Sequence, residues 1–284
     1  MHFINNSAVK NGQVAGRLLT EKIEEADAVF VVAGSGISTA SGFRFYYDNN
    51  DAWFEKYFGD LGRKYGYRNA YYGSFFGDTQ FYGRMTLANA ALPTGKPYTQ
   101  LKQLLEGKDT FIWTTNIDGQ FARVFSEEQI CTENGDSRYM VCPRERKTWS
   151  ALEPAQKMYD ATRADTSIPE EAMPKCPSCG ADLFPWTLNN NCDLHEQQMK
   201  YMQDFLHRNS GKKILFLEIG VHHGVYAGLI RKPARNLAVK IPQAFYMVIN
   251  LNYEDVPHEM KDRGIVLQGD VAEIFENAMQ QISK

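Results

Sequence analysis

The sequence predicts an α/β protein built on an open parallel β-sheet. Short apolar runs of the kind that form buried parallel strands recur along the chain, and each ends near Gly, Asn or Asp. The first run is followed at once by a glycine turn and a stretch of small residues that suits a helix. Because strand, glycine turn and helix in this order open nucleotide-binding α/β folds, we expect a Rossmann-like domain. The five expected strands cover residues 28–32, 110–114, 213–217, 244–249 and 265–267.

Helices are expected at both ends of this pattern. Residues 13–26 carry apolar side chains at helical spacing, and so does the segment that begins at Val271. Asp270 and Glu273 suit the N-cap and N3 positions of the second helix, which makes a variant of the capping box.

Two stretches depart from the alternation of strand and helix. Residues 43–85 are crowded with Tyr, Phe and Gly, including Phe45, Tyr46 and Tyr47, and they suit either a packed helical layer or a lid beside a ligand. Residues 140–205 contain four cysteines and several prolines, which indicates a small inserted domain. The expected division is a Rossmann-like domain over 1–139 and 206–284, with a helical or lid insertion at 43–95, and a cysteine-containing domain over 140–205.

Composition narrows the classes of partner and location. The 284 residues are 43% hydrophobic and 23% charged, which is ordinary for a soluble globular protein. The formal net charge of −3 argues against non-specific nucleic-acid binding. Since no run of 18 apolar residues and no secretory signal is present, we expect no membrane span and no export. An odd number of cysteines, five, suits thiols or metal ligands in a reducing, cytoplasmic setting.

The glycine turn after the first expected strand is a candidate phosphate loop. Glycines allow the backbone to approach a phosphate, and the N-terminus of the following helix offers N–H groups to it. The spacing is not that of GxGxxG, because the third glycine, Gly42, arrives late. From spacing alone, a tight turn without a ligand fits as well as a phosphate loop. The segment reads Ala33-Gly34-Ser35-Gly36-Ile37-Ser38.

Several motifs resemble those of sirtuins, in the family's order. The stretch from Gly34 to Gly42 is similar to the sirtuin cofactor loop, and residues 115–119, Thr-Asn-Ile-Asp-Gly, resemble the Gln-Asn-Ile-Asp motif. Residues 176–180, Cys-Pro-Ser-Cys-Gly, resemble the second half of the sirtuin zinc module. The matches run from about residue 14 to the end of the chain.

This resemblance implies an enzyme that uses NAD⁺, with defined roles for individual residues. Ala33 and the loop 34–38 would bind the pyrophosphate, and Asn116 and Asp118 would lie beside the nicotinamide and its ribose. The residues implied at the adenosine end are Gly220, Val221, Asn250, Asp270 and Val271.

The sequence departs from the sirtuin pattern at motifs that include the family's catalytic base. The family's Pro-Asp-Phe-Arg segment is absent, and its Leu-His-Gly motif, whose histidine is the general base of deacylation, reads Glu133-Asn134-Gly135. An amide has no proton-accepting nitrogen near neutral pH, and the loss of a general base typically costs roughly 10²–10⁴-fold in rate. Cleavage of the nicotinamide bond needs mainly positioning and charge stabilisation. We therefore expect Asn134 to orient the ribose of NAD⁺.

An amide at this position is similar to the macrodomain-linked, or class M, sirtuins of microbes. That resemblance implies protein mono-ADP-ribosylation, with a lipoyl-carrying protein as the acceptor and a macrodomain hydrolase as a possible partner. Three alternatives stay open: a deacylase with another base, an NAD⁺ glycohydrolase, and a non-catalytic module that binds NAD⁺ or ADP-ribose.

The cysteines suggest an incomplete zinc site. Cys176 and Cys179 form one CxxC pair, but Cys142 is followed by Glu145 where a second cysteine belongs. The fourth ligand would be Glu145 or a neighbour such as Cys192 or His195; the alternative is a metal-free knuckle.

Three further side chains have two interpretations each. His222 and His223 follow Gly220, where sirtuins place small hydroxyl residues, and they suit either a phosphate contact or a solvent-facing loop. Trp186 lies where sirtuins line the acyl-lysine channel, and it suits either a substrate groove or ordinary packing.

Overall fold

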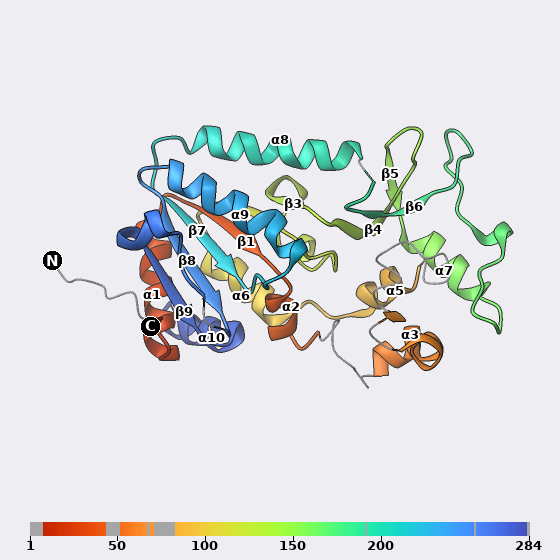
Figure 1. The fold of residues 1–284 in the computed structure, drawn as a ribbon, viewed down its shortest axis with the longest axis horizontal. Coiled ribbons are helices and arrows are strands. Elements are labelled where there is room, and N and C mark those ends of the chain that lie inside the picture. The colour runs from red at the N-terminus through yellow and green to blue at the C-terminus, as the bar shows by residue number, and fades with distance from the viewer. Residues whose placement is uncertain are drawn as a thin grey trace.

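A six-stranded parallel sheet forms the core of the larger part of the molecule, on the left in Figure 1. The computed structural model describes residues 8–43, 52–66, 69–70, 83–190, 192–252 and 254–282. The strand order β3-β2-β1-β7-β8-β9 runs outward in both directions from the pair β1 and β7, which is the Rossmann arrangement. The strands are β1 Ala28–Ala33, β2 Asp109–Thr114, β3 Ile130–Thr132, β7 Ile214–Ile219, β8 Phe245–Asn250 and β9 Gly264–Gln268.

All five expected strands are confirmed, with ends that shift by up to two residues. The strand β3 was not expected, because Ile130–Thr132 is too short to show a pattern in the sequence. It pairs in parallel with β2 from Ile112 to Thr114 and ends just before Glu133 and Asn134. The missed strand is therefore the one that carries the predicted Asn134 to the sheet edge.

Helices cover both faces of the sheet. One face packs against α1 (Gly12–Glu25), α2 (Gly36–Ala40), α6 (Lys96–Leu104) and α10 (Val271–Ile282). The other packs against α8 (Asp193–Arg208) and α9 (Val225–Lys240). Two layers of buried apolar side chains on a parallel sheet are what near-continuous apolar strands require.

The predicted start of the last helix is confirmed in part. The Asp270 carboxylate accepts a hydrogen bond of 2.7 Å from the N–H of Ala272, which is the N2 position of α10. At the other end of the chain, the Asn11 side chain accepts the N–H of Val14 at 3.0 Å and caps α1.

A second, antiparallel sheet is inserted after β3. It has the order β5-β4-β6 and comprises β4 Gly135–Val141, β5 Thr148–Ser150 and β6 Phe184–Thr187, with α7 (Leu152–Asp160) beside it. Helix α8 then leads from this small sheet back across the parallel sheet (Figure 1). The expected domain boundaries at 139/140 and 205/206 stay a prediction; β4 already begins at Gly135, and α8 packs against β3 and β2.

The aromatic-rich segment forms a helical layer where the structure describes it. Helices α3 (Ala52–Tyr65) and α5 (Arg84–Ala91) enclose a cluster in which the rings of Phe54 and Phe58 stack at 4.9 Å. The segment that includes Phe45, Tyr46 and Tyr47 lies outside the described residues, so the lid interpretation stays a prediction.

Within the described ranges, no helix is both long and apolar enough to cross a membrane.

Short 3-10 helices lie in several of the connections between the elements above. The 3-10 helices are η2 Phe121–Arg123, η3 Glu127–Gln129, η4 Glu170–Ala172 and η5 His258–Arg263.

Replacing Phe205 with alanine should destabilise the fold strongly. Phe205 of α8 is fully buried against the sheet, with its ring 5.8 Å from that of Phe30 and 5.9 Å from that of Phe111. The cavity left by the missing ring should lower the free energy of unfolding by about 3–5 kcal/mol, which a denaturant titration would measure. Leu152→Ala, at a side chain that is 51% exposed, is the control and should change stability little. Equal effects of the two substitutions would contradict the packing described for α8.

Candidate functional site

The carboxyl ends of β1 and β7 meet at the point where the strand order reverses. Ligands of open parallel sheets bind at such a switch point. The loop after β1 and the loop after β7 are joined there by hydrogen bonds from the Gly34 N–H to the Ile219 carbonyl, 3.0 Å, and from the Gly36 N–H to the Gly220 carbonyl, 2.9 Å. The predicted loop residues Ala33 to Ser38 therefore lie beside the predicted Gly220 and Val221.

Glycines in both loops permit this close approach. A Cβ atom on Gly36 would lie 2.5 Å from the Cα of Gly220, and a Cβ atom on Gly34 would lie 2.7 Å from the Gly220 carbonyl oxygen. Both neighbours are backbone atoms that have no side-chain freedom to move away. Glycine is therefore required at these positions by the packing of one loop on the other. The N–H groups of Gly34 and Gly36 already donate to carbonyls of the β7 side, so an anion bound here would be held by other groups of the loop.

A buried cluster of polar side chains lies next to this loop. Ser38 donates a hydrogen bond of 2.6 Å to the Asp118 carboxylate and lies 2.8 Å from the Tyr98 hydroxyl. The Asn116 amide donates to both hydroxyls at 3.2 Å, and the Gln120 N–H donates to Asp118 at 3.0 Å. The structure thus brings together the predicted Ser38, Asn116 and Asp118.

Tyr98 belongs to the same cluster although the sequence analysis did not identify it. It lies on α6, one of several apolar or aromatic residues at helical spacing, and no neighbouring motif distinguishes it from a core residue. Burial raises the pKa of the Asp118 carboxyl, and the hydrogen bonds from Ser38 and Gln120 oppose that shift. Burial together with the nearby Asp118 raises the pKa of Tyr98 well above its ordinary value, so Tyr98 remains a neutral phenol.

Asn134 has one buried atom that the protein does not pair. Its side chain is only 5% exposed, and its amide nitrogen donates to the Thr115 carbonyl at 3.2 Å. Because a carbonyl oxygen can face only the NH₂ end of the amide, this bond fixes the orientation of the group. The other end, Oδ1, is buried without a hydrogen-bond partner. A buried acceptor in this state is suited to a donor from outside the chain, such as a hydroxyl.

The turn after Asn134 is held by close backbone packing. Gly135 has φ +92°, in the left-handed region that favours glycine, and a Cβ atom there would lie 2.2 Å from the Trp186 carbonyl oxygen. Trp186 itself is buried, with its ring near those of Tyr139 and His195, so the packing interpretation of this side chain is the one the described contacts favour. The small sheet thereby fixes the turn that presents Asn134.

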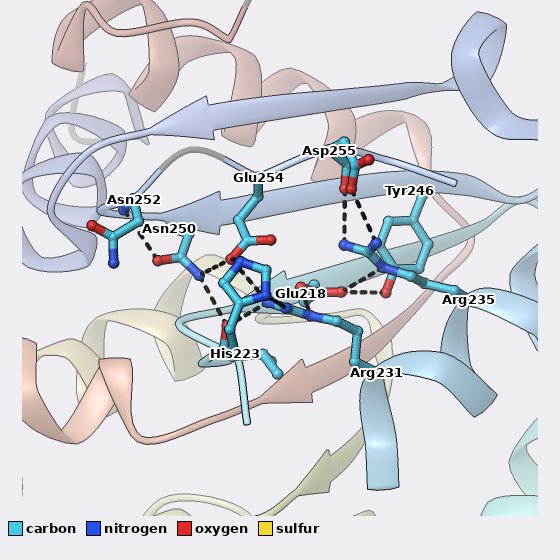
Figure 2. Close-up of polar contacts among 10 residues, drawn as sticks. Glu218, His223, Arg231, Arg235, Tyr246, Asn250, Asn252, Glu254 and Asp255 are labelled. Carbon is cyan, nitrogen blue, oxygen red and sulfur yellow. Dashed lines mark hydrogen bonds and ion pairs between the residues drawn. The ribbon is translucent and has the colours of Figure 1, made fainter. Parts of the chain in front are cut away.

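On the β7 side lies a network of charged and amide side chains that includes Arg231, Asn250 and Glu254 (Figure 2), and it holds the Val221 carbonyl. That oxygen accepts hydrogen bonds from the Arg231 guanidinium and, at 3.0 Å, from the Asn250 amide. Asn250 also donates to Glu254 at 3.2 Å and accepts the N–H of Asn252 at 3.3 Å. The predicted Asn250 therefore positions the loop through Val221; its predicted contact with adenosine stays a prediction.

The same network is anchored by a fully buried carboxylate, Glu218 of β7 (Figure 2). Glu218 accepts hydrogen bonds from Arg231 at 2.9 Å, Arg235 at 3.3 Å and the Tyr246 hydroxyl at 2.7 Å. His223 is 69% exposed at the rim, and its Nε2 lies 2.9 Å from Glu254. In the sequence, this network is indicated only by Glu218, a charged residue inside an apolar strand. The arginines of α9 that pair with Glu218 belong to no recognisable motif.

The last two predicted cofactor residues have structural roles. Asp270 is exposed and caps α10, while Val271 is buried in the core below the sheet. Gly269 donates its N–H to the Asn250 carbonyl at 2.9 Å, so this turn does lie next to Asn250.

The predicted cysteines converge in the small sheet domain. The sulfur atoms of Cys142, Cys176 and Cys179 all lie within 4.8 Å of one another, with 3.5 Å between Cys142 and Cys179. Burial raises the pKa of Cys176, but hydrogen bonds from the N–H groups of Cys179 and Ser178 lower it, and the net shift is downward. Two sulfurs from the CxxC turn and a third from Cys142, directly after β4, fit three of the four ligand positions of a structural zinc ion.

The proposed fourth ligands do not join this cluster as it stands. The Glu145 N–H donates to the Cys142 sulfur at 3.4 Å, but the Glu145 carboxylate is not among the converging atoms and lies 3.6 Å from Lys147. Cys192 packs against Trp186 and Val141, and His195 lies with a different cysteine. A zinc ion held by the three cysteines would take its fourth ligand from water or from a rotated Glu145.

Replacing Gly36 with alanine should destabilise the switch point. The added Cβ would overlap the Gly220 backbone, and overpacking of this kind costs about 1–3 kcal/mol. The measurement is the melting temperature, with Gly228→Ala as the matched control. Gly228 lies in α9, and a Cβ atom added to it would meet nothing within 4 Å, so its substitution should leave stability unchanged or raise it by about 0.5–1 kcal/mol. A lower melting temperature for Gly228→Ala than for Gly36→Ala would contradict the loop packing.

Replacing Cys176 with serine should remove one zinc ion. Elemental analysis of protein purified without chelator should show about one equivalent less zinc than the wild type, with a lower melting temperature, because structural zinc contributes folding energy directly. Ser178→Ala, between the two cysteines, is the control and should retain the metal. Equal zinc content in wild type and Cys176→Ser would show that the cluster is a metal-free knuckle.

Comparison with curated proteins finds two relatives along most of the chain, while no family model matches. A protein ADP-ribosyltransferase of Staphylococcus aureus is 28% identical over 94% of this chain and 87% of its own length. A probable bifunctional ADP-ribose hydrolase/ADP-ribosyltransferase of Fusarium oxysporum is 26% identical over 89% of this chain, which spans 46% of that protein. These relatives confirm the expected similarity to ADP-ribosyltransferases.

Comparison with solved structures gives the fold. The complex of a Sir2 homologue with NAD matches with a TM-score of 0.59 at 16% identity, and the alignment covers 98% of this chain and 96% of that one. Sir2Tm bound to a propionylated peptide matches with a TM-score of 0.57 at 18% identity, covering 94% and 98% of the two chains. The chain therefore has the sirtuin fold, a Rossmann-like sheet with a small inserted domain, and along nearly its whole length it is similar to a protein ADP-ribosyltransferase.

Proposed function

We propose that this protein is an NAD⁺-dependent protein mono-ADP-ribosyltransferase. In this reaction the bond between C1′ of the ribose and nicotinamide breaks, and its electron pair leaves with the nicotinamide nitrogen. A nucleophilic atom of the acceptor protein bonds to C1′ and releases its proton to solvent. The relatives named as ADP-ribosyltransferases support the reaction type.

The observation that carries the proposal is the unpaired oxygen of Asn134. A buried amide oxygen accepts a hydrogen bond but cannot remove a proton at neutral pH. It is therefore suited to holding a ribose hydroxyl in place, and unsuited to activating that hydroxyl as a nucleophile, which the second half of a deacylation requires. The geometry supports the positioning of NAD⁺ and a single displacement at C1′.

The buried cluster at Asp118 supports the same step. As C1′ loses nicotinamide, positive charge develops on the sugar, and a nearby carboxylate stabilises it most in a site that excludes water. Hydrogen bonds from Ser38 and Gln120 favour the charged form of Asp118 against its burial. Asn116, whose amide nitrogen is held by Ser38 and Tyr98, would present its oxygen side to the cofactor. The loops that end in Gly36 and Val221 would bind the phosphates and the adenosine end.

The histidines favour transfer over deacylation. Among those in the described part of the chain, none hydrogen-bonds to Asn116, Asp118 or Asn134. His223 is engaged with Glu254 and Arg231, and His195 faces Glu133 on the side of β3 that packs on α8. A replacement base for the missing histidine is therefore not supplied by these side chains.

The proposal also names the class of acceptor and a companion enzyme. A protein acceptor follows from the reaction named for the Staphylococcus relative, and a lipoyl-carrying protein follows from the resemblance to class M sirtuins. The Fusarium relative, named for both hydrolase and transferase activities, supports pairing with a hydrolase that removes the modification. A cytoplasmic location, suggested by free cysteines, belongs to the same proposal.

Asn134→Ala should slow modification of the acceptor about tenfold, since one positioned hydrogen bond is worth about 1.4 kcal/mol. Radiolabel from NAD⁺ on a lipoylated carrier protein is the measurement, and the wild type should leave acetyl-lysine peptides unchanged. Asn189→Ala, at an exposed asparagine after β6, is the matched control and should retain the wild-type rate.

The same reactions separate the alternatives by product. Free ADP-ribose without labelled protein would identify a glycohydrolase, and O-acyl-ADP-ribose from acyl peptides would identify a deacylase. NAD⁺ binding by calorimetry without turnover on any acceptor would identify a binding module. A wild-type rate for Asn134→Ala would show that the amide is not part of the site.

A further inference from the structure

A second cluster of metal-ligating side chains lies between β3 and α8. The sulfur of Cys131, a carboxylate oxygen of Glu133 and a ring nitrogen of His195 lie within 4.8 Å of one another. Cys131 is on β3, Glu133 directly follows that strand, and His195 is in the first turn of α8. None of these residues belongs to the cysteine cluster of the small sheet domain.

The His195 nitrogen in this cluster lacks a hydrogen-bond partner. The side chain is 27% exposed, but its Nε2 atom is buried and makes no hydrogen bond; its polar contact is a long ion pair with Glu133, formed if the ring is protonated. Its neighbour, the Glu133 Oε2 atom, lies 3.8 Å away, too far for a hydrogen bond. Two ligands at about 2.1 Å from one tetrahedral ion lie about 3.4 Å apart, so the observed spacing is closer to that of co-ligands than to that of a hydrogen-bonded pair.

The surroundings complete a coordination shell. Met199 lies four residues after His195 and therefore on the same face of α8, with its sulfur 3.6 Å from that of Cys131. The indole N–H of Trp113 donates to Glu133 at 2.9 Å and would orient the carboxylate toward the ion. The shell thus offers sulfur, nitrogen and oxygen ligands in the combination that zinc accepts.

We propose that Cys131, Glu133 and His195 bind a zinc ion that fastens β3 to α8. The thiol of Cys131 loses its proton to solvent as the sulfur–zinc bond forms. One thiolate and one carboxylate then balance the charge of the divalent ion, so the occupied site is neutral. The fourth position is taken by water, and the Met199 sulfur, which accepts the hydrogen bond of the Cys131 thiol at 3.6 Å when no ion is bound, packs beside the site. Zinc binding at this site does not depend on the proposed transferase activity.

Zinc content and cobalt spectra of the full-length chain test the proposal. After reconstitution with zinc and removal of the excess, His195→Ala should contain about one equivalent less metal than the wild type. The control is His207→Ala, an exposed histidine on the same helix, which should match the wild type. Reconstitution of Cys176→Ser with Co²⁺ should still give the near-ultraviolet absorption of a cobalt–thiolate bond, and that absorption should disappear when Cys131→Ser is added.

A conservative variant guards against loss of the fold. Glu133→Gln keeps the shape of the side chain and an acceptor for Trp113, so it should remain folded while its zinc affinity falls at least tenfold. Equal zinc content and affinity in wild type, His195→Ala and Glu133→Gln would overturn the proposal. So would a cobalt–thiolate absorption that Cys131→Ser leaves unchanged.

Discussion

The backbone contact between Gly36 and Gly220 is the constraint on which the candidate site depends. Two neighbouring parallel strands, β1 and β7, send their loops in opposite directions, and the loops can stay joined only if neither carries a side chain at the crossing. The hydrogen bond from Gly36 to the Gly220 carbonyl then sets the height of both loops above the sheet. From the first loop, α2 carries Ser38 inward to Asp118; from the second, Val221 faces Arg231 and Asn250. A shift at the crossing would move both halves of the site together.

The two sides of the crossing are stabilised in different ways. On the β1 side the polar groups are hydroxyls, amides and one carboxylate, each within hydrogen-bond distance of another. On the β7 side two arginines neutralise the buried Glu218, and Arg231 also reaches Glu254 and the Val221 carbonyl (Figure 2). A buried carboxylate of this kind is tolerable only because it is paired. The arginine–carboxylate network therefore supports the loop after β7, while the cluster on the β1 side is held by hydrogen bonds around the single carboxylate of Asp118.

The sequence could predict those parts of the fold whose signal is local. Five strands, the glycine turn and the cap at Asp270 follow from apolar runs and turn residues close together in the chain, and the structure has them. Strand β3 was missed because three residues carry no periodicity, and it is stabilised by pairing with β2 and packing under α8. Tyr98 and Arg231 were missed for a related reason. Tyr98 reaches the site from a helix distant in sequence from Ser38, and Arg231 lies on the helix that follows the Val221 loop; in both helices one aromatic or one charge has no distinctive neighbours.

For His195, the sequence suggested a different ligand cluster from the one that the fold brings it to. His195 was considered as a ligand for the cluster at Cys142 because it follows those cysteines along the chain. In the fold, α8 carries it to the parallel sheet instead, beside Cys131 and Glu133. Spacing alone predicts a ligand pair when both ligands lie on one local turn, as Cys176 and Cys179 do, whereas the joining of Cys142 was expected from the resemblance to the sirtuin zinc module. Between separate elements, the direction of the connecting helix decides which cluster a residue joins.

Compared with the histidine of the sirtuin motif, Asn134 has the same arrangement of one hydrogen-bond donor and one acceptor, but it cannot accept a proton. A neutral imidazole has a donor on one ring nitrogen and an acceptor on the other. The Asn134 amide has the same division, with a nitrogen that donates to the Thr115 carbonyl and an oxygen that remains free to accept. In the proposed function Asn134 would therefore still orient a ribose hydroxyl, but it could not take the proton, because a protonated amide is far too acidic to form at neutral pH. The rest of the site would still bind NAD⁺ and weaken the nicotinamide bond. Under the proposed function, this division leaves cleavage of the nicotinamide bond with attack of an acceptor atom on C1′, without the later step that needs a base.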